Sequence, residues 1–394
     1  MSLRLPALVL SGCLALSACA STDHGTRQVG QLPEDQSTPE ASLRREFDEL
    51  ERRTVRSGRR NADPALNAYV RDLGCAVAGE FCDEMRFYII ETPEFNASMA
   101  PNGMMLVNTG LLLRVETESE LAFVMAHEFG HYFENHITER LAAARNASRS
   151  SSIVMAGLSF TGVGALLALG YTAGALADVM EFSREQEREA DMFAARFANE
   201  YGYNAAAGAR AWVNLSAEIS ASSNETTRRR FTRESAFASH PLTEERIAYL
   251  RASSREGAGA GEDHVAYRAL IRPFLQLWLE AENANRDAGA TLALLDRLAQ
   301  PGLDLGVIEY ARGEVYRSRG DDGDAALALA SFTRATEQAD CPPQAWRQIG
   351  VMYRHQNRRE EAIAAFEHYL ALSPDAADSQ LIGGMIETLR GDGT

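Results

Sequence analysis

The chain has 394 residues, a formal net charge of −16, and 45% hydrophobic and 24% charged residues. This length is enough for two or three domains with proper hydrophobic cores, and the balance of residue types is that of a globular protein. The acidic character argues against nucleic acid as a partner, because binding to phosphates needs a basic surface.

The N-terminus has the organisation of a secretory signal. Arg4 precedes an apolar run, and small residues lead to Cys19. The sequence Leu-Ser-Ala-Cys that ends at Cys19 resembles the lipobox of bacterial lipoproteins, in which the cysteine is acylated. We therefore expect a lipoprotein signal peptide over residues 1–18 and a lipid anchor at Cys19. No aspartate follows Cys19, which by resemblance to lipoprotein sorting favours the outer membrane; an ordinary signal cleaved near Ala20 is the alternative.

Residues 19–43 are polar and contain Pro, Gly and Ser, the composition of a flexible tether. A metal-binding region, described below, is expected over residues 44–255. Near its start, Cys75 and Cys82 lie seven positions apart. In an oxidising compartment they form a local disulfide, or they remain as two buried thiols.

Two strands are expected next. Arg86–Glu91 and Met104–Asn108 have the composition of strands, and the turn residues Asn96–Gly103 lie between them. We therefore expect a small hairpin. A sheet edge in such a protein can bind an extended peptide by strand addition, and a purely structural hairpin is the alternative.

The central motif lies in Leu121–His136, where His127, Glu128 and His131 form His-Glu-x-x-His. Apolar residues recur at helical spacing, so we expect an amphipathic helix. Positions i and i+4 lie on one face of a helix, so both imidazoles can hold one zinc ion, with Glu128 beside them as general base. His136 would lie about 140° further round the helix than His131, outside this ligand set. A third protein ligand must come from elsewhere.

A second motif opens another helix, where Glu187 and Asp191 are four positions apart and share a face. The succession of His-Glu-x-x-His and Glu-x-x-Ala-Asp resembles the gluzincin metallopeptidases. This family includes the CAAX prenyl protease and the heat-shock protease HtpX. Within the family, the chain resembles the branch of the periplasmic β-barrel-assembly-enhancing protease, which carries C-terminal tetratricopeptide repeats.

The resemblance implies one zinc ion per chain, held by His127, His131 and Glu187. It implies that Glu128 is the catalytic base. It also implies that Asp191 steadies a ligand histidine, in keeping with the need of metal-bound imidazoles for an acceptor.

Two further segments resemble the family. Ser239-His240-Pro241 together with Arg246-Ile247 resembles its His-Pro segment, which implies that His240 gates the zinc or stabilises the oxyanion; a surface loop histidine is the alternative. Asn96 and Ala97 resemble the substrate-binding edge, although Ser98 stands where an aromatic residue is common.

Residues 153–177 form an uncharged stretch, and this stretch is long enough to span a bilayer. A single crossing would place His127 and Glu187 on opposite sides of the membrane. We therefore expect a helix or lid over the active site that dips into the membrane surface, or a buried pair of helices.

Ala252–Asp263 is rich in Gly, Ala and Ser and has the composition of a linker. Residues 263–394 follow as a helical domain. Its periodic positions have the spacing of tetratricopeptide repeats; they are Gly313, Tyr316, Ala328 and Phe332, then Trp346, Gly350, Tyr353, Ala362, Phe366 and Pro374. Such repeats stack into concave surfaces for peptides or partner proteins, and a simple helical bundle is the alternative.

The expected fold is mainly α, with a zincin-like metalloprotease domain of helices and a small β-sheet followed by helical tetratricopeptide repeats. The expected function is that of a zinc-dependent endopeptidase, lipid-anchored in the periplasm at the outer membrane. The family resemblance implies quality control or assembly of outer-membrane proteins, with misfolded or unassembled ones as substrates and contact with the β-barrel assembly machinery through the repeats. The alternative is a chaperone or assembly scaffold with a latent zinc site.

Overall fold

The computed structural model describes residues 26–30, 39–140, 182–228 and 244–391. The predicted signal peptide, Cys19, the apolar stretch 153–177 and His240 lie outside these residues. The N-terminal elements are α1 Pro39–Arg56, α2 Pro64–Ala78, η1 Gly79–Glu84, β1 Arg86–Ile90, β2 Ala97–Met99, β3 Met104–Asn108, α3 Thr109–Arg114, α4 Glu118–Phe133, α8 Arg184–Tyr201, α9 Ala206–Ala221 and α11 Glu244–Ala252. The C-terminal elements are α12 His264–Ile271, η2 Arg272–Phe274, α13 Leu275–Asn283, α14 Ala288–Ala299, α15 Leu305–Arg319, α16 Asp324–Thr336, α17 Gln344–His355, α18 Arg359–Leu372 and α19 Ser379–Arg390.

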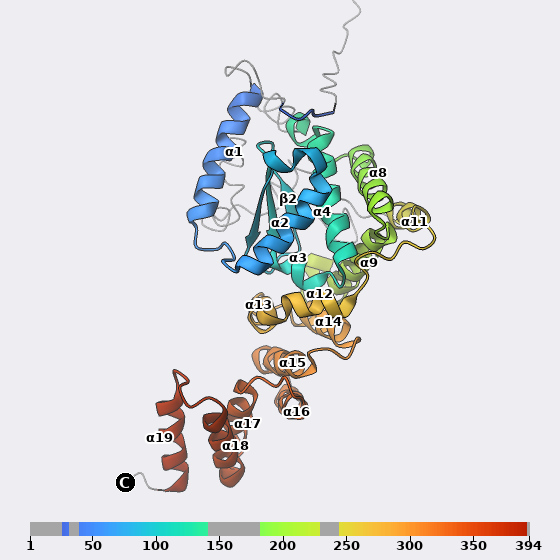
Figure 1. Cartoon of the computed structure of the whole chain (residues 1–394). Helices are drawn as coiled ribbons and strands as arrows, with labels where there is room; N and C mark the ends of the chain where they lie inside the picture. The colour runs from blue at the N-terminus through green and yellow to red at the C-terminus, as the bar shows by residue number, and fades with distance from the viewer. Residues whose placement is uncertain (1–25, 31–38, 141–181, 229–243, 392–394) are drawn as a thin grey trace, which may run out of the picture.

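The mainly α fold is confirmed, and the small sheet lies among the N-terminal helices (Figure 1). The strand order is β1-β3-β2, with β1 parallel and β2 antiparallel to β3. The predicted hairpin of the first and last strands is therefore wrong. The segment expected as a turn holds the three-residue strand β2, which is too short to show an alternating pattern. Strand β2 forms the hairpin with β3, and Ala97 lies on this edge strand.

Helix α2 begins at a clear start signal, and its apolar face packs on the sheet. The Asp63 carboxylate accepts a hydrogen bond from the Leu66 amide at 2.8 Å, and Pro64 occupies the first helical position. Gly74 allows close contact with β1, since a Cβ there would lie 2.2 Å from the Phe87 ring. Cys75 and Cys82 form a disulfide that ties the end of α2 to η1.

The first helices after the expected linker share a core with the N-terminal part. One cluster of buried apolar side chains runs from Phe47 to Val315. The Tyr267 hydroxyl of α12 donates to the Leu112 carbonyl at 2.8 Å. The linker itself is docked, because the Gly261 carbonyl accepts from the Ser119 amide at 3.0 Å. The junction between the two parts is therefore packed.

Helices α15–α18 form two helical hairpins, which continue away from this core towards the C-terminus (Figure 1). Both hairpins contain a close contact between a glycine and an aromatic ring. A Cβ at Gly313 would lie 2.4 Å from the Phe332 ring, and one at Gly350 would lie 2.5 Å from the Phe366 ring. In each hairpin a glycine on the first helix receives an aromatic ring from the second, as the repeat spacing predicts.

Part of the expected tether packs on the N-terminal body. Arg27 is buried, its Nε donates to the Tyr132 carbonyl at 3.0 Å, and its guanidinium lies 4.3 Å from the Tyr132 ring centre. Its Nη2 also donates to the Thr138 hydroxyl at 2.9 Å. None of the helices in the described ranges is long and apolar enough to cross a membrane.

Candidate metal centre

Helix α4 carries the first motif through the middle of the N-terminal body. The Thr117 hydroxyl caps its start by accepting from the Glu120 amide at 3.2 Å. Every residue from Ser119 to Tyr132 is buried, because α2, α8, α9 and β2 all contact the helix. Gly130 allows α8 to approach closely, since a Cβ there would lie 3.1 Å from the Ala190 Cα. This crossing brings the second motif to the first.

His127, His131 and Glu187 lie together, and each is at most 1% exposed. The two Nε2 atoms are 3.2 Å apart. The carboxylate oxygens of Glu187 lie 3.5 Å from each of these nitrogens. A tetrahedral zinc ion with bonds of about 2.0–2.1 Å sets its ligands about 3.3 Å apart. The three donors therefore fit one zinc ion in both chemistry and spacing.

Asp191 stands behind His127, as the resemblance implied. His127 Nδ1 lies 2.9 Å from the Asp191 carboxylate, which leaves Nε2 directed at the cluster. Burial would raise the pKa of Asp191, but the charge of Arg246 and the hydrogen bond from His127 outweigh it and lower the pKa to about 2. Asp191 therefore remains an acceptor at neutral pH and fixes the orientation of the ring.

Arg246 joins Asp191 to the proposed ligand Glu187. Its Nε and Nη2 donate to the two oxygens of Asp191 at 2.8 and 2.9 Å. Its Nη1 lies 2.6 Å from Glu187. The Tyr249 hydroxyl, one turn along α11, also donates to Asp191. Arg246 thus holds both carboxylates from behind and Tyr249 holds Asp191, and the sequence predicted neither role.

His131 has a partner of its own. Helix α4 ends at Phe133, and Asn135 has a left-handed φ of 58°. The expected helix through His136 is therefore wrong, and the turn brings the His136 ring back to 3.0 Å from His131 Nδ1. His136 in turn contacts Glu189 at 2.8 Å. Phe182 stacks on the other side of His131, with ring centres 3.8 Å apart.

Glu128, Asn96 and Ala97 also lie in the described part of the chain. Glu128 follows His127 on α4 and is 5% exposed. Ala97 lies on β2, which contacts α4, and the carbonyl of Asn96 just before it accepts from the Asn108 amide at 3.0 Å. His240 and Cys19 lie outside the described residues. The spacing of Arg246 and Tyr249 on α11 places both on one face of that helix, but the sequence does not show that this face lies behind the ligands.

Comparisons with known proteins agree with this geometry. Residues 61–254 match peptidase family M48, and residues 343–376 match the tetratricopeptide repeat. Over 202 residues the chain is 28% identical to the putative beta-barrel assembly-enhancing protease of Vibrio cholerae, which covers 49% of this chain and 40% of that protein. Over 160 residues it is 28% identical to the beta-barrel assembly-enhancing protease of Yersinia pestis, with 36% and 31% covered.

A mitochondrial relative is matched as well. The chain is 28% identical over 142 residues to the mitochondrial metalloendopeptidase OMA1 of Schizosaccharomyces pombe, with 36% of this chain and 41% of that protein covered. The chain thus spans less than half the length of each of these relatives. The resemblance drawn from the two motifs is confirmed: the chain contains a peptidase M48 domain followed by a tetratricopeptide repeat.

Proposed function

We propose that the chain is a zinc-dependent endopeptidase with one zinc ion held by His127, His131 and Glu187. The observation that carries the proposal is the spacing of these three donors, 3.2 to 3.5 Å apart and buried. The peptidase M48 domain and the metalloendopeptidase named among its relatives support it.

When bound, zinc supplies Lewis-acid chemistry: it polarises a carbonyl and makes water more acidic. Glu128 lies next to a ligand on α4 and takes the proton of the attacking water, then delivers it to the leaving amine. Asp191 holds His127 in one tautomer, and Arg246 holds both Asp191 and Glu187. We assign His240, by the family resemblance, either to gating the zinc or to stabilising negative charge on the substrate oxygen.

Strand β2 supplies a binding edge for the substrate. It pairs with β3 and contacts the helix that carries His127. An extended peptide added along Asn96 and Ala97 would form backbone hydrogen bonds beside the metal, which orients the scissile bond without demanding one sequence.

We further propose that the protein is a periplasmic lipoprotein, anchored at the outer membrane through Cys19. Its substrates would be misfolded or unassembled outer-membrane proteins, and its repeats would contact the β-barrel assembly machinery. The lipobox-like sequence supports the anchor, and the names of the bacterial relatives support the role.

A scaffold or chaperone with a latent zinc site is the second candidate. It is favoured by one observation: the ligands His127 and His131 are fully buried, and Glu187 is only 1% exposed. A substrate carbonyl could reach such a cluster only after part of the protein moves.

Digestion of an unfolded β-barrel precursor by the purified mature protein tests the proposal. Glu128→Gln should abolish cleavage at unchanged zinc content, while Glu185→Gln, an exposed change on α8, should leave cleavage intact. If neither parent nor Glu128→Gln cleaves although zinc is bound, His240→Ala decides between the candidates. Release of activity by that variant means a gate, and continued inactivity contradicts the endopeptidase.

A further inference from the structure

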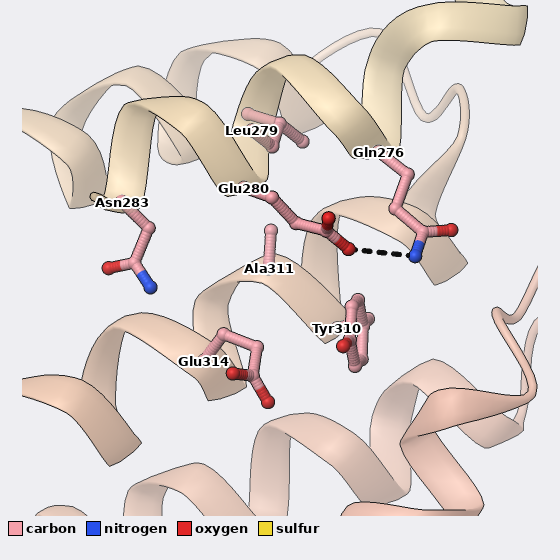
Figure 2. A pocket seen from close by; sticks show the side chains of 7 residues that line it. All are labelled: Gln276, Leu279, Glu280, Asn283, Tyr310, Ala311 and Glu314. Carbon is pink, nitrogen blue, oxygen red and sulfur yellow. Dashed lines mark hydrogen bonds between the residues drawn. The ribbon is translucent and has the colours of Figure 1, made fainter. Parts of the chain in front are cut away.

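A hollow of about 160 Å³ lies between α13 and α15 (Figure 2), and none of its lining residues belongs to the metal centre. Its apolar lining includes the side chains of Leu279 and Ala311, and Glu280, Asn283 and Glu314 supply polar groups around it. The volume is of the size of one long side chain. None of these residues takes part in the chemistry proposed above.

Tyr310 provides the sign that this hollow is built to receive a polar group. The residue is only 4% exposed and lines the hollow. Among the described residues its hydroxyl makes no hydrogen bond with the protein and is not sealed from solvent, so it can accept or donate a hydrogen bond inside the hollow. Burial raises the pKa of Tyr310, and Glu314 and Glu280 raise it further, so the hydroxyl stays protonated and faces negative charge.

Glu314 and Glu280 differ in how far neighbouring groups compensate the negative charge of their carboxylates. Glu314 accepts hydrogen bonds from Arg317 at 2.6 Å and from Gln348 at 2.7 Å. Glu280 accepts only from the neutral amide of Gln276, at 2.9 Å, and no cation pairs with it in the described ranges (Figure 2). The hollow therefore has an uncompensated carboxylate at its rim.

We infer that this hollow binds the positively charged side chain of an arginine or lysine in a protein partner. Such a side chain has an apolar stem, which matches Leu279 and Ala311, and a cationic head, which matches Glu280 and Glu314. The Tyr310 hydroxyl oxygen would accept from the same head, and its ring offers a face to the cation. The inference deepens the proposed role of the repeats in contacting partners, and it does not depend on cleavage.

The experiment measures binding, so its failure is distinct from failure of the peptidase proposal. The probe is N-acetyl-arginine N-methylamide, titrated against the full mature protein and followed by saturation-transfer NMR. The neutral isostere N-acetyl-citrulline N-methylamide is the matched ligand. We expect saturable binding of the arginine probe and binding of the citrulline probe that is about tenfold weaker or more, because one charge-assisted contact is lost.

Two variants locate the site. Glu280→Gln removes the uncompensated charge and should weaken binding of the arginine probe about tenfold, whereas Glu337→Gln, an exposed change at the C-cap of α16, should not alter it. Ala311→Phe fills the hollow and should abolish binding. If Ala311→Phe fails to fold, Glu280→Gln still carries the test because Glu280 is exposed at the rim.

Equal binding of the two probes would overturn the inference. So would the absence of any arginine binding, or an equal loss in Glu280→Gln and Glu337→Gln, since the latter would mean only that a protein with a net charge of −16 attracts cations everywhere.

Discussion

Arg246 and Arg114 are both buried between two carboxylates, but they lie in different parts of the molecule. Arg246 holds Asp191 and Glu187 behind the metal centre. Arg114, on α3, lies 2.7 Å from Glu218 of α9 and 2.8 Å from Glu282 of α13. The first arginine positions groups around a proposed zinc ion, and the second fastens the helices after residue 263 to the N-terminal body.

The same arrangement, an arginine buried between two carboxylates, therefore has a different role at each place. Separate measurements of unfolding and of zinc affinity distinguish the two roles. At the junction the network is closed by the protein alone, because Arg297 also pairs with Glu218 and lies 2.7 Å from Glu116. At the metal centre the Glu187 carboxylate is shared: one oxygen lies near Arg246 and His127, and the other lies near His131. Loss at the junction should appear in unfolding, and loss at the centre should appear in zinc affinity.

The largest effect is expected from Arg114→Met. The change leaves Glu218 and Glu282 buried without their common partner, which costs about 3–5 kcal/mol of the free energy of unfolding. Urea denaturation measures the loss, and zinc affinity of the folded variant should equal that of the parent. Arg52→Met, at an exposed ion pair on α1, is the matched control and should leave the free energy of unfolding nearly unchanged. A similar small loss for Arg114→Met would contradict a fastening role.

Arg246→Met should act mainly on the metal. Without Arg246, Asp191 and Glu187 lose their positioning, so zinc affinity should fall about 10- to 100-fold, or about 1.4–2.8 kcal/mol. Competition with a chromogenic chelator measures this, with Arg196→Met on the exposed face of α8 as control. An unchanged zinc affinity would show that Arg246 is only structural.

Gly350→Ala tests the packing of the repeats without changing any charge. Gly350→Ala would place a methyl group 2.5 Å from the Phe366 ring, which must shift at a cost of about 1–2 kcal/mol. Thermal unfolding should show the loss, and zinc affinity should not change. Gly383→Ala on α19, where a Cβ meets nothing within 4 Å, is the control. Equal thermal stability of the two alanine variants would show that the close contact between Gly350 and Phe366 does not contribute to stability.

The smallest effect is expected from a half-exposed version of the same ion pairing. Burial would raise the pKa of Glu51, but hydrogen bonds from Arg86 and Tyr88 outweigh it and lower the pKa. A carboxylate with a lowered folded pKa stabilises the protein above its ordinary pKa of 4.5 and loses that contribution as the pH falls below it.

Glu51→Gln should therefore cost about 1 kcal/mol near neutral pH, since Arg86 is more than a third exposed, and less at acid pH. Urea unfolding at several pH values measures the slope. A cost that stays constant from neutral to acid pH would show that the pairing contributes nothing.

The sequence was informative where chemistry repeats at fixed spacing. His127 and His131 could be placed on one helical face, and Glu187 was found through its neighbours Ala190 and Asp191. The sheet was harder, because β2 has three residues and the parallel pairing of β1 with β3 depends on packing that no local pattern records. The contact of His136 with His131 depends on a single left-handed residue, Asn135.

The buried arginines show a second limit of prediction from sequence. A chain rich in Arg and Glu offers many candidate ion pairs, and only the fold shows which are buried. Arg246 stood in a segment with family resemblance, yet its partners Glu187 and Asp191 lie more than fifty positions earlier. Arg114 carried no signal, because its partners come from two separate helices.

Zinc binding by Glu187→Gln tests the central claim most directly. The parent, this variant and Glu185→Gln are each loaded with zinc, passed over a desalting column and measured by native mass spectrometry. The account predicts one zinc ion in the parent and in Glu185→Gln, and an affinity at least about tenfold lower in Glu187→Gln. Equal zinc content and affinity in all three proteins would contradict the assignment of Glu187 as the third ligand.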